Sequence, residues 1–336
     1  MIYFLGIESS CDETAAAVFT SSRTILSNVV ATQTELHTPF GGVVPEIAAR
    51  AHLRQLIPTI DLALKKANIE LSQLGAVAVN YKPGLAGALL MGVSCARTLA
   101  LILNIPLIGV NHLEAHIYAC RLSAGRDIFP CIGLVVSGGH TALFDCQTPL
   151  QMKRIGSTRD DAAGEAFDKI AAVLGLGFPG GPAVEREAAQ GDVNAYAFPR
   201  SFLKEDRLEF SFSGLKTAVI YSIYGQGKVA GPPPGPGKFR ADIAASFQQA
   251  VIDVLVTKCQ QALKKNKQTR LAVGGGVIAN RALRNALQTM TDRNGFELFI
   301  PPMNLCTDNA AMAALAIEKW EKNNFSPLDL DIEPNS

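Results

Sequence analysis

Two histidines four residues apart, His112 and His116, stand in the stretch NHLEAHIYA. Side chains four apart on an α-helix point only about 40° away from one another. Both imidazoles would therefore lie on one helix face, where a single metal ion can reach them. The alternative is a pair of ordinary surface or core histidines, and the spacing alone leaves both open.

The same stretch bears on protease chemistry. In zinc proteases a glutamate directly follows the first histidine and activates the metal-bound water. Here Leu113 holds that position, and Glu114 lies about 200° around the helix from His112. The pattern therefore permits a metal site and argues against a metalloprotease.

Asp308, in LCTDNAAMAA, is a candidate third ligand. It follows a predicted strand and precedes a predicted helix, so a helix N-cap is the plainer role. The two roles are compatible because a carboxylate has two oxygens. Two imidazoles and one carboxylate leave open positions on Fe²⁺ or Zn²⁺, which suits a catalytic or substrate-holding ion.

Two glycine turns are candidate anion sites. In VVSGGHT, the residues Ser137, Gly138 and Gly139 stand at a sharp strand end, where bare N–H groups can bind phosphate or carboxylate. A tight hairpin needs the same glycines. In VGGGVIANRAL, three glycines between a strand and a helix permit close approach of a ring or phosphate, although the spacing is not GxGxxG. Asn280 then begins a helix, either as a cap or as an adenine contact.

A row of acids stands in DDAAGEAFDKIAAVLG. Asp161, Glu165 and Asp168 recur at helical spacing and are predicted to share one face. Such a row is usually solvated. The adjoining LGFPGGPAVE, predicted to be a loop, leaves open that the carboxylates meet ribose hydroxyls.

Composition sets the class of protein. The 336 residues are 48% hydrophobic and 18% charged, with a net charge of +1. This predicts a globular core and no global attraction to nucleic acid or membrane. Seven scattered cysteines without a CxxC pair predict reduced thiols and a cytoplasmic protein. No basic leader precedes Glu8, and GLAGALLMGVSCA is predicted too short and glycine-rich to span a bilayer, within a buried helix.

Strands and helices alternate along the chain, which predicts an α/β fold. The pattern of strand, small-residue turn and strand that opens with IYFLGIE, SSCDET and AAAVFT returns about 130 residues later as CIGLVV, SGGH and TALFDC. The recurrence predicts a duplicated domain.

Nine motifs together resemble one family. They are GIESSCDET, NHLEAH, LVVSGGHT, DDAAGEAFDK, GFPGGP, FSFSGLKTAV, ASFQQAV, GGGVIANRALR and CTDNAAMAA. In this order they are similar to the tRNA N6-adenosine threonylcarbamoyltransferases (TsaD, formerly O-sialoglycoprotein endopeptidase). The resemblance implies the two-lobed actin-like fold of Hsp70 and sugar kinases. The expected lobes are residues 1–125, completed by a C-terminal helix 308–325, and residues 126–307.

The resemblance also implies the site. His112, His116 and Asp308 would bind one divalent ion, with Fe²⁺ favoured and Zn²⁺ the alternative. The substrate-binding residues it implies are Val135, Val136, Ser137, Gly138, Gly139, Asp168, Gly181, Glu185 and Asn280. The turn Ser137–Gly139 would supply phosphate or oxyanion contacts. No motif residue is an obvious nucleophile, which favours direct transfer.

The implied reaction moves the threonylcarbamoyl group from threonylcarbamoyl-AMP to the N6 amine of the adenosine immediately 3′ of the anticodon, in tRNAs reading codons that begin with A. The implied partners are tRNA, a smaller paralogue (TsaB-like) and a small P-loop ATPase (TsaE-like), with no membrane. An actin-like ATPase or sugar kinase is the alternative function, and a metalloprotease a weaker one.

Two positions depart from the family pattern. Glu185 stands in GGPAVE where the family has a shorter acid, and Lys82 stands in KPGLAGAL where it has glycine. Lys82 is predicted to add a cation near the cleft.

Basic residues are unevenly spread. Residues 200–240 hold seven Lys/Arg against three acids, and residues 258–270 hold five against none. Both are candidate phosphate contacts for tRNA, although such clusters are often solvated faces. The second cluster consists of Lys258, Lys264, Lys265, Lys267 and Arg270.

Overall fold

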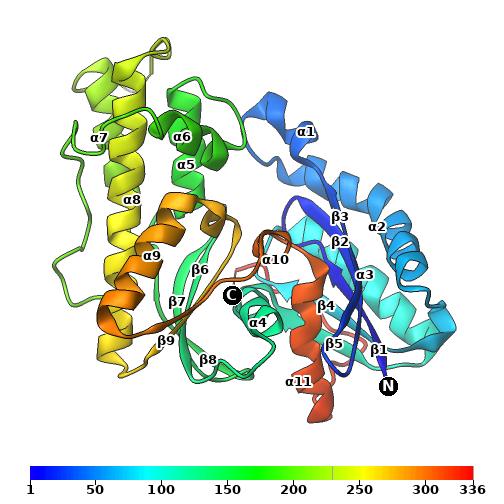
Figure 1. Cartoon of the computed structure of the whole chain (residues 1–336). Coiled ribbons are helices and arrows are strands. Elements are labelled where there is room, and N and C mark those ends of the chain that lie inside the picture. Colours follow the sequence, from blue (N-terminus) through cyan, green and yellow to red (C-terminus); the bar gives the residue numbers. More distant parts are fainter. Residues whose placement is uncertain (229, 336) are drawn as a thin grey trace. The chain divides into compact units, whose positions relative to one another are not determined.

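The computed structural model describes residues 1–228 and 230–335 (Figure 1). The chain forms two compact units. The first unit is Met1–Asp127 together with Pro301–Ser336, and the second unit is Ile128–Ile300. Each unit has one five-stranded sheet.

The sheet of the first unit has the order β3-β2-β1-β4-β5. Its strands are β1 (Tyr3–Glu8), β2 (Glu13–Thr20), β3 (Ile25–Thr32), β4 (Leu74–Lys82) and β5 (Leu107–Asn111). The first three strands are antiparallel, and β4 and β5 run parallel to β1. The longer helices are α2 (Pro45–Ala67), α3 (Ala86–Leu103) and α4 (His112–Ala124), and the short ones α1 (Thr34–His37), η1 (Thr38–Phe40), η2 (Leu71–Gln73), α10 (Met303–Cys306), η4 (Ala310–Leu315) and α11 (Ala316–Glu321).

The second unit repeats this plan, with the strand order β10-β9-β6-β7-β8. Its strands are β6 (Cys131–Val136), β7 (Thr141–Thr148), β8 (Gln151–Ser157), β9 (Arg270–Gly274) and β10 (Glu297–Phe299). The hairpin β6–β7 is antiparallel and β9 runs parallel to β6, as in the first unit. Its helices are α5 (Ala163–Val173), α6 (Gly180–Ala188), α7 (Ser213–Tyr224), α8 (Lys238–Lys265), η3 (Gly276–Ala279) and α9 (Arg281–Asn294). The predicted repetition of the hairpin is confirmed.

Central strands explain the apolar runs of the sequence. Every residue of β6 is buried, as are the last five of β1. A strand covered by helices on both faces is apolar at successive positions instead of alternating. All seven cysteines are free, and five of them are buried.

The apolar helix α3 differs from its prediction. It packs on β4 and α2, but Leu90, Leu101 and Ile102 are exposed, the last by 72%. The prediction of a buried helix is therefore wrong for one of its faces. At 18 residues with a mean hydropathy of 1.8, α3 has the length and composition to cross a membrane, so the prediction that this region is too short is wrong too. A core helix of a soluble protein meets the same criterion.

Two helix boundaries also differ from the sequence expectation. The segment LGFPGGPAVE, predicted to be a loop, contains the start of α6 at Gly180. Helix α5 begins only at Ala163, so Asp161 precedes it and does not share a helix face with Glu165 and Asp168. Asp161 instead pairs with Lys169 and Lys216.

Lys258 is part of the core and does not belong to a basic surface. It is 0% exposed on α8. Its Nζ donates to the carbonyl oxygens of Phe202, Glu205 and Arg207 at 2.6–3.0 Å and to Oε1 of Gln261 at 2.9 Å. A buried ammonium has three N–H groups that must find acceptors to offset its loss of water, and these four oxygens supply them. The residue therefore fixes the segment 202–207 against α8 and is unavailable to RNA.

We predict that Lys258→Met lowers the free energy of unfolding by about 3 kcal/mol, because the buried carbonyl oxygens lose their donor. Lys264→Met is the matched control, since Lys264 lies on the same helix and is exposed. Denaturant unfolding followed by circular dichroism measures both. Equal stability of the two variants would contradict the structural role of Lys258.

Candidate metal centre

Helix α4 begins at the first candidate ligand. The side chain of Asn111 accepts hydrogen bonds from the N–H groups of Leu113 (2.9 Å) and Glu114 (3.4 Å), which makes it the N-cap. His112 and His116 then lie on one face, with ring centroids 4.6 Å apart. Their side chains are 3% and 0% exposed. The two imidazoles thus share one face of the helix, as their spacing predicts.

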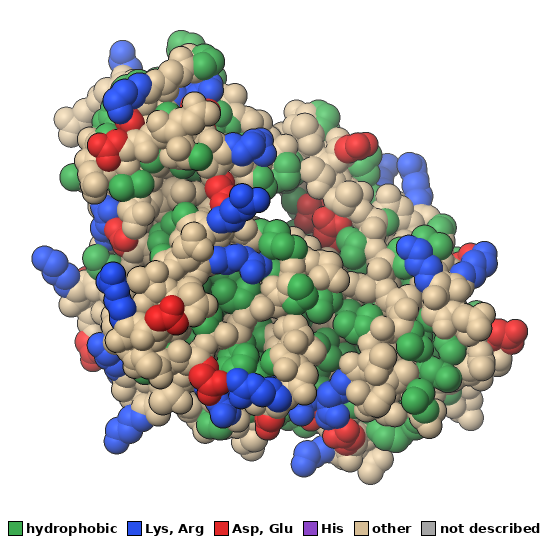
Figure 2. Space-filling model, viewed as in Figure 1, with side chains coloured by type: hydrophobic (Ala, Val, Ile, Leu, Met, Phe, Trp, Pro, Cys, Tyr) green, Lys and Arg blue, Asp and Glu red, His purple; other side chains and the backbone are tan. Residues whose placement is uncertain are grey.

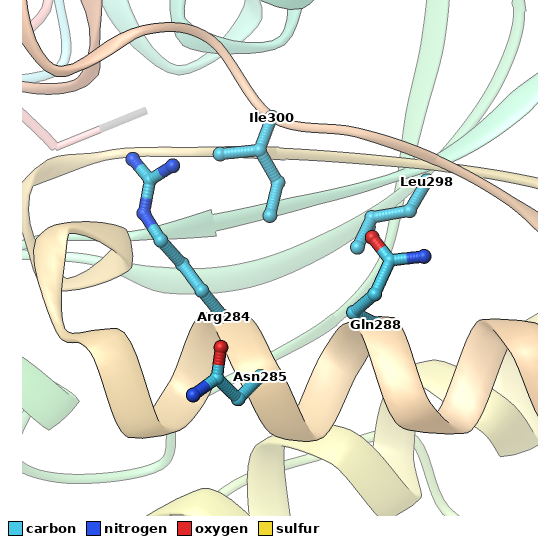
Figure 3. A pocket seen from close by; sticks show the side chains of 5 residues that line it. All are labelled: Arg284, Asn285, Gln288, Leu298 and Ile300. Atoms are coloured by element: carbon cyan, nitrogen blue, oxygen red, sulfur yellow. The ribbon is translucent and has the colours of Figure 1, made fainter.

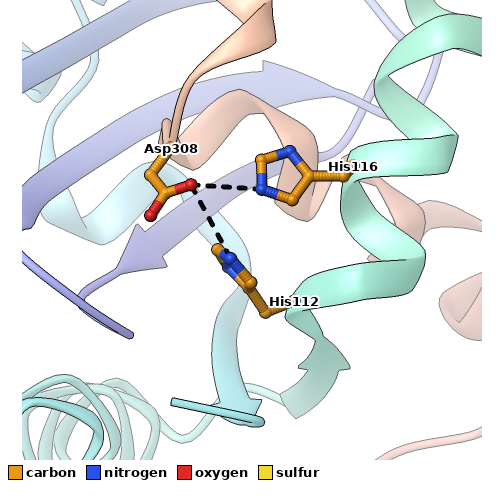
Figure 4. Close-up of side chains that lie close together, drawn as sticks. All are labelled: His112, His116 and Asp308. Carbon is orange, nitrogen blue, oxygen red and sulfur yellow. Dashed lines mark hydrogen bonds and ion pairs between the residues drawn. The ribbon is translucent and has the colours of Figure 1, made fainter. Parts of the chain in front are cut away.

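Asp308 reaches this face from the other end of the sequence (Figure 4). Its Oδ1 lies 3.1 Å from Nε2 of His116 and 3.7 Å from Nε2 of His112. The N-cap of the following η4 is Asn309, so Asp308 does not fill the plainer role considered for it. Gly6 allows this arrangement, because a Cβ there would lie 2.6 Å from the carbonyl oxygen of Ala310.

The three side chains can hold one metal ion. Their candidate ligand atoms all lie within 4.8 Å of one another, and ligands at about 2.1 Å from one ion are themselves about 3–3.5 Å apart. The donor set of two imidazoles and a carboxylate suits Fe²⁺ or Zn²⁺. Nδ1 of His116 is buried and has no hydrogen-bond partner among the residues that the structure describes. The residues present therefore fit a divalent ion.

Further groups surround His112 on its other side. Its Nδ1 lies 3.0 Å from Oε2 of Glu8 and 3.0 Å from Oγ of Ser10. Glu8 is fully buried and also accepts hydrogen bonds from the backbone N–H of Ser10 and the side chain of Asn80. Sequence reasoning missed these residues, although Glu8 and Ser10 belong to the motif GIESSCDET.

The acids set the electrostatics of the site. Burial opposes the charged imidazolium, but the carboxylates of Glu8 and Asp308 outweigh it and raise the pKa of His112 to about 9. Burial, reinforced by the neighbouring Asp12, raises the pKa of Glu13 to about 8. Burial also raises the pKa of Asp12, and the charge of Asp308 adds to this. An excess of carboxylates thus favours a cation at this place.

Glu114 is not part of the centre. It is absent from the group of possible ligands, and the charges that act on it are those of Lys319 and Lys82. Both observations agree with the expectation that Glu114 points away from the metal ligands. The structure also gives Lys82 a role that the sequence did not: its Nζ is 2.8 Å from Oε2 of Glu333 in the C-terminal segment.

The residues predicted to bind substrate lie together in the second unit. Val135 and Val136 end β6, and Gly274 on the parallel strand β9 is the register partner of Val135. The turn Ser137–Gly139 follows β6, and the segment from Gly275 to Asn280 follows β9. Both segments therefore meet at the carboxyl ends of neighbouring strands, where α/β proteins commonly bind ligands.

Close backbone packing shapes this turn. The N–H of Gly164, in the first turn of α5, donates to the carbonyl oxygen of Ser137 at 3.2 Å. Gly275 has φ +98°, and a Cβ there would meet the carbonyl oxygen of Val136 at 2.4 Å. A Cβ added at Gly138 or Gly139 would meet no atom within 4 Å. Within residues 1–228 and 230–335, their N–H groups donate to no backbone acceptor.

The remaining predicted residues join helix ends to one another. Asp168 accepts from the N–H of Gly180 at 2.7 Å, beside Gly181 at the start of α6. Glu185 accepts from the N–H of Arg281 at 2.7 Å. Asn280 caps α9 through the N–H of Leu283 and donates to Gln248. Asp168 and Glu185 thus have structural partners that sequence reasoning did not name, whereas the cap was one of the two roles predicted for Asn280.

A separate cavity of about 310 Å³ opens between α9 and β10 (Figure 3). It is lined by Arg284, Asn285, Gln288, Leu298 and Ile300. None of these residues belongs to the predicted site. The Arg284 Nε donates to the carbonyl oxygen of Ile278 at 2.6 Å, which holds this side chain against the η3 segment.

Surface charge is mixed. Figure 2 shows Lys and Arg side chains interspersed with Asp and Glu on the face drawn. Within the cluster of residues 258–270, Lys265 pairs with Asp206, and Arg270 pairs with Glu297 and donates to the carbonyl oxygen of Phe129. With Lys258 buried, the predicted five-residue RNA cluster is reduced. Lys264 and Lys267 are its exposed members that form no ion pair with another described residue.

We predict that His116→Ala lowers the metal content from about one ion per chain to a small fraction, because two ligands rarely hold an ion in water. Glu114→Gln, on the same helix, is the control and should keep the metal. Elemental analysis after dialysis measures both, with circular dichroism to check the fold. Full occupancy in His116→Ala would refute the assignment, and loss in Glu114→Gln would revive the protease reading.

Comparison with known proteins identifies the family. The model for "TsaD: tRNA N6-adenosine threonylcarbamoyltransferase" matches residues 24–315. The chain is 53% identical to the tRNA N6-adenosine threonylcarbamoyltransferase of Rhodopirellula baltica, over 98% of this chain and 96% of that protein. It is 51% identical to the protein of that name from Geobacillus thermodenitrificans, over 99% and 96%.

Solved structures agree on the fold. Component A of (R)-2-hydroxyglutaryl-CoA dehydratase from Acidaminococcus fermentans superposes with a TM-score of 0.55 at 15% identity, over 95% of this chain and 99% of that one. At this identity the likeness concerns the fold alone, and together with the repeated sheets it establishes the predicted actin-like α/β fold. The coverage and identity of the curated relatives carry the stronger conclusion: the chain belongs to the tRNA N6-adenosine threonylcarbamoyltransferase family of acyltransferases.

Proposed function

We propose that this chain transfers the threonylcarbamoyl group from threonylcarbamoyl-AMP to the N6 amine of the adenosine immediately 3′ of the anticodon, in tRNAs reading codons that begin with A. The main support is the 53% identity along nearly the whole chain. In this reaction the amine nitrogen attacks the carbamoyl carbon, the bond to AMP breaks, and the amine loses a proton. The two units are proposed to be the two lobes of the actin-like fold.

We propose that His112, His116 and Asp308 hold Fe²⁺, with Zn²⁺ as the alternative. Two histidines and one carboxylate are the ligand set typical of non-haem Fe²⁺. A bound ion would supply Lewis acidity toward the carbonyl oxygen of the donor. The chain's part is to hold the ligands in place: both imidazoles are buried, and α4 fixes their spacing.

The adenylate is proposed to bind in the second unit. The open N–H groups of Gly138 and Gly139 suit a phosphate or a developing oxyanion, and the first turn of α5 adds favourable dipoles beside them. Asp168, Gly181, Glu185 and Asn280 would hold the nucleoside. Glu185 and Asn280 both support the start of α9, so they can orient that helix as well as contact ligand.

The proposed partners are tRNA, a TsaB-like paralogue and a TsaE-like ATPase, and the proposed location is the cytoplasm without membrane contact. Because the net charge is only +1, the chain has to hold RNA through local groups of Lys and Arg. A partner can supply part of that surface.

We predict that depleting this protein removes threonylcarbamoyladenosine from cellular tRNA. Re-expression of the unaltered chain restores the nucleoside, whereas Asp308→Ala does not, because the ion loses its carboxylate ligand. Mass spectrometry of tRNA nucleosides measures the outcome. Unchanged modification after depletion would refute the proposed reaction, and turnover of ATP with a sugar would point to the kinase alternative.

For the adenylate, we predict that Asp168→Asn weakens binding of a non-hydrolysable analogue of threonylcarbamoyl-AMP roughly ten- to a hundredfold, through loss of charge-assisted hydrogen bonding worth about 1.5–3 kcal/mol. Asparagine keeps an oxygen that can accept from the N–H of Gly180, so α6 retains its contact. Asp168→Ala removes that contact as well and serves as the comparison. Calorimetry showing wild-type affinity in both variants would place the ligand elsewhere.

For RNA, we predict that Lys264→Glu with Lys267→Glu weakens tRNA binding and lowers the slope of log affinity against log salt by about two. Lys258→Met should leave the slope unchanged, because its ammonium faces protein carbonyl groups. Filter binding at several salt concentrations measures both. An unchanged slope in the double variant assigns the RNA contact to the 200–240 segment or to a partner.

A further inference from the structure

Glu8 is the most completely enclosed carboxylate near the candidate metal centre. It ends β1, the middle strand of its sheet, and is 0% exposed. A carboxylate at such a position loses its water and destabilises the fold unless hydrogen bonds replace it. The neighbouring positions of β1 are apolar and pack the core. An acid at this position of β1 therefore indicates a specific function.

The contacts of Glu8 indicate what this function is. Its Oε1 accepts from the N–H of Ser10, and its Oε2 faces both the Asn80 amide and Nδ1 of His112, the latter at 3.0 Å. Since an ionised carboxylate only accepts hydrogen bonds, Nδ1 of His112 must carry the proton. The other ring nitrogen, Nε2, is thereby left to face Asp308 at 3.7 Å.

The second histidine lacks such support. Nε2 of His116 faces Asp308, but its buried Nδ1 has no hydrogen-bond partner among the described residues. Of these two imidazoles, only that of His112 therefore has a carboxylate at Nδ1, the ring nitrogen turned away from Asp308. Ser10 also touches Nδ1 of His112, at 3.0 Å, but a hydroxyl can donate as well as accept and does not select a tautomer.

We propose that Glu8 is a positioning residue that holds His112 in the tautomer and orientation in which Nε2 binds the metal ion. This inference rests on the metal role proposed for His112, His116 and Asp308. A carboxylate behind a ligating histidine commonly increases metal affinity about 10–100-fold, through ligand basicity and a fixed ring orientation. Glu8 would act only through His112, without touching substrate.

The test measures metal affinity in the full chain. Co²⁺ and Zn²⁺ are titrated against a chromophoric chelator for the unaltered chain, Glu8→Gln, Glu8→Asp and Ser10→Ala. We expect Glu8→Gln to weaken binding about 10–100-fold and to alter the visible spectrum of bound Co²⁺. Glu8→Asp keeps the charge and should restore part of the affinity, and Ser10→Ala should change it little. Wild-type affinity and spectrum in Glu8→Gln would overturn the proposal.

A second measurement does not depend on a variant that folds. In the unaltered chain loaded with Zn²⁺, nitrogen NMR of His112 should show a protonated Nδ1 and a metal-bound Nε2. Metal bound through Nδ1 would overturn the proposal.

Two further variants, His112→Ala and Asp308→Ala, distinguish a wrong metal site from a wrong role for Glu8. If both variants still bind metal, the proposed metal site itself is wrong. If both lose the metal while Glu8→Gln keeps it, only the role of Glu8 is wrong.

Discussion

The packing of η4 against β1 and α4 is the constraint on which the candidate metal centre depends. Asp308 and His116 are 192 positions apart in sequence, and their side chains meet only because the C-terminal segment returns to the first unit. All six residues of η4 are buried, and five of them are alanine or leucine. Small side chains here and at Gly6 allow close backbone approach, which brings the carboxylate onto the histidine face. A Cβ at position 6 would collide with the carbonyl oxygen of Ala310, two residues after Asp308.

Much of the fold could be predicted from the sequence because its signals are local. The apolar strands β1 and β6 follow from their apolar runs, and the helix α4 follows from the spacing of His112 and His116. Strands β3 and β8 were missed, since their mixed polar sequences ILSNVVAT and QMKRIGS, with several exposed or half-buried residues, carry no continuous apolar signal. Helix α6 was missed because its first turn is Gly-Gly-Pro, and the N–H of Gly180 is satisfied by Asp168, twelve residues away.

The metal ligands could be named from sequence, whereas their surroundings could not. The spacing of His112 and His116 is a helical signal, and Asp308 followed from chemistry and the family motif. The contacts of Glu8, Ser10 and Asn80 depend on the register between β1 and β4 and on the position of α4, which no local pattern specifies. Lys258 shows the same limit: a lysine in a basic stretch is expected on the surface, and only the path of residues 202–207 explains its burial. The lobe boundaries and the roles of the substrate-binding residues stay predictions.

The duplicated hairpin has acquired opposite chemistry in the two units. After β1, the chain continues into Asp12 and Glu13. Burial together with neighbouring carboxylates raises the pKa values of both residues, so a nearby cation would be stabilised here. After β6, the corresponding turn presents Gly138 and Gly139 beside the first turn of α5. Their N–H groups donate to no backbone acceptor in the described part of the chain, which favours an anion there. The carboxylates that follow β1 thus suit a cation and the glycine turn that follows β6 suits an anion, which are the charges of the metal ion and the adenylate in the proposed reaction.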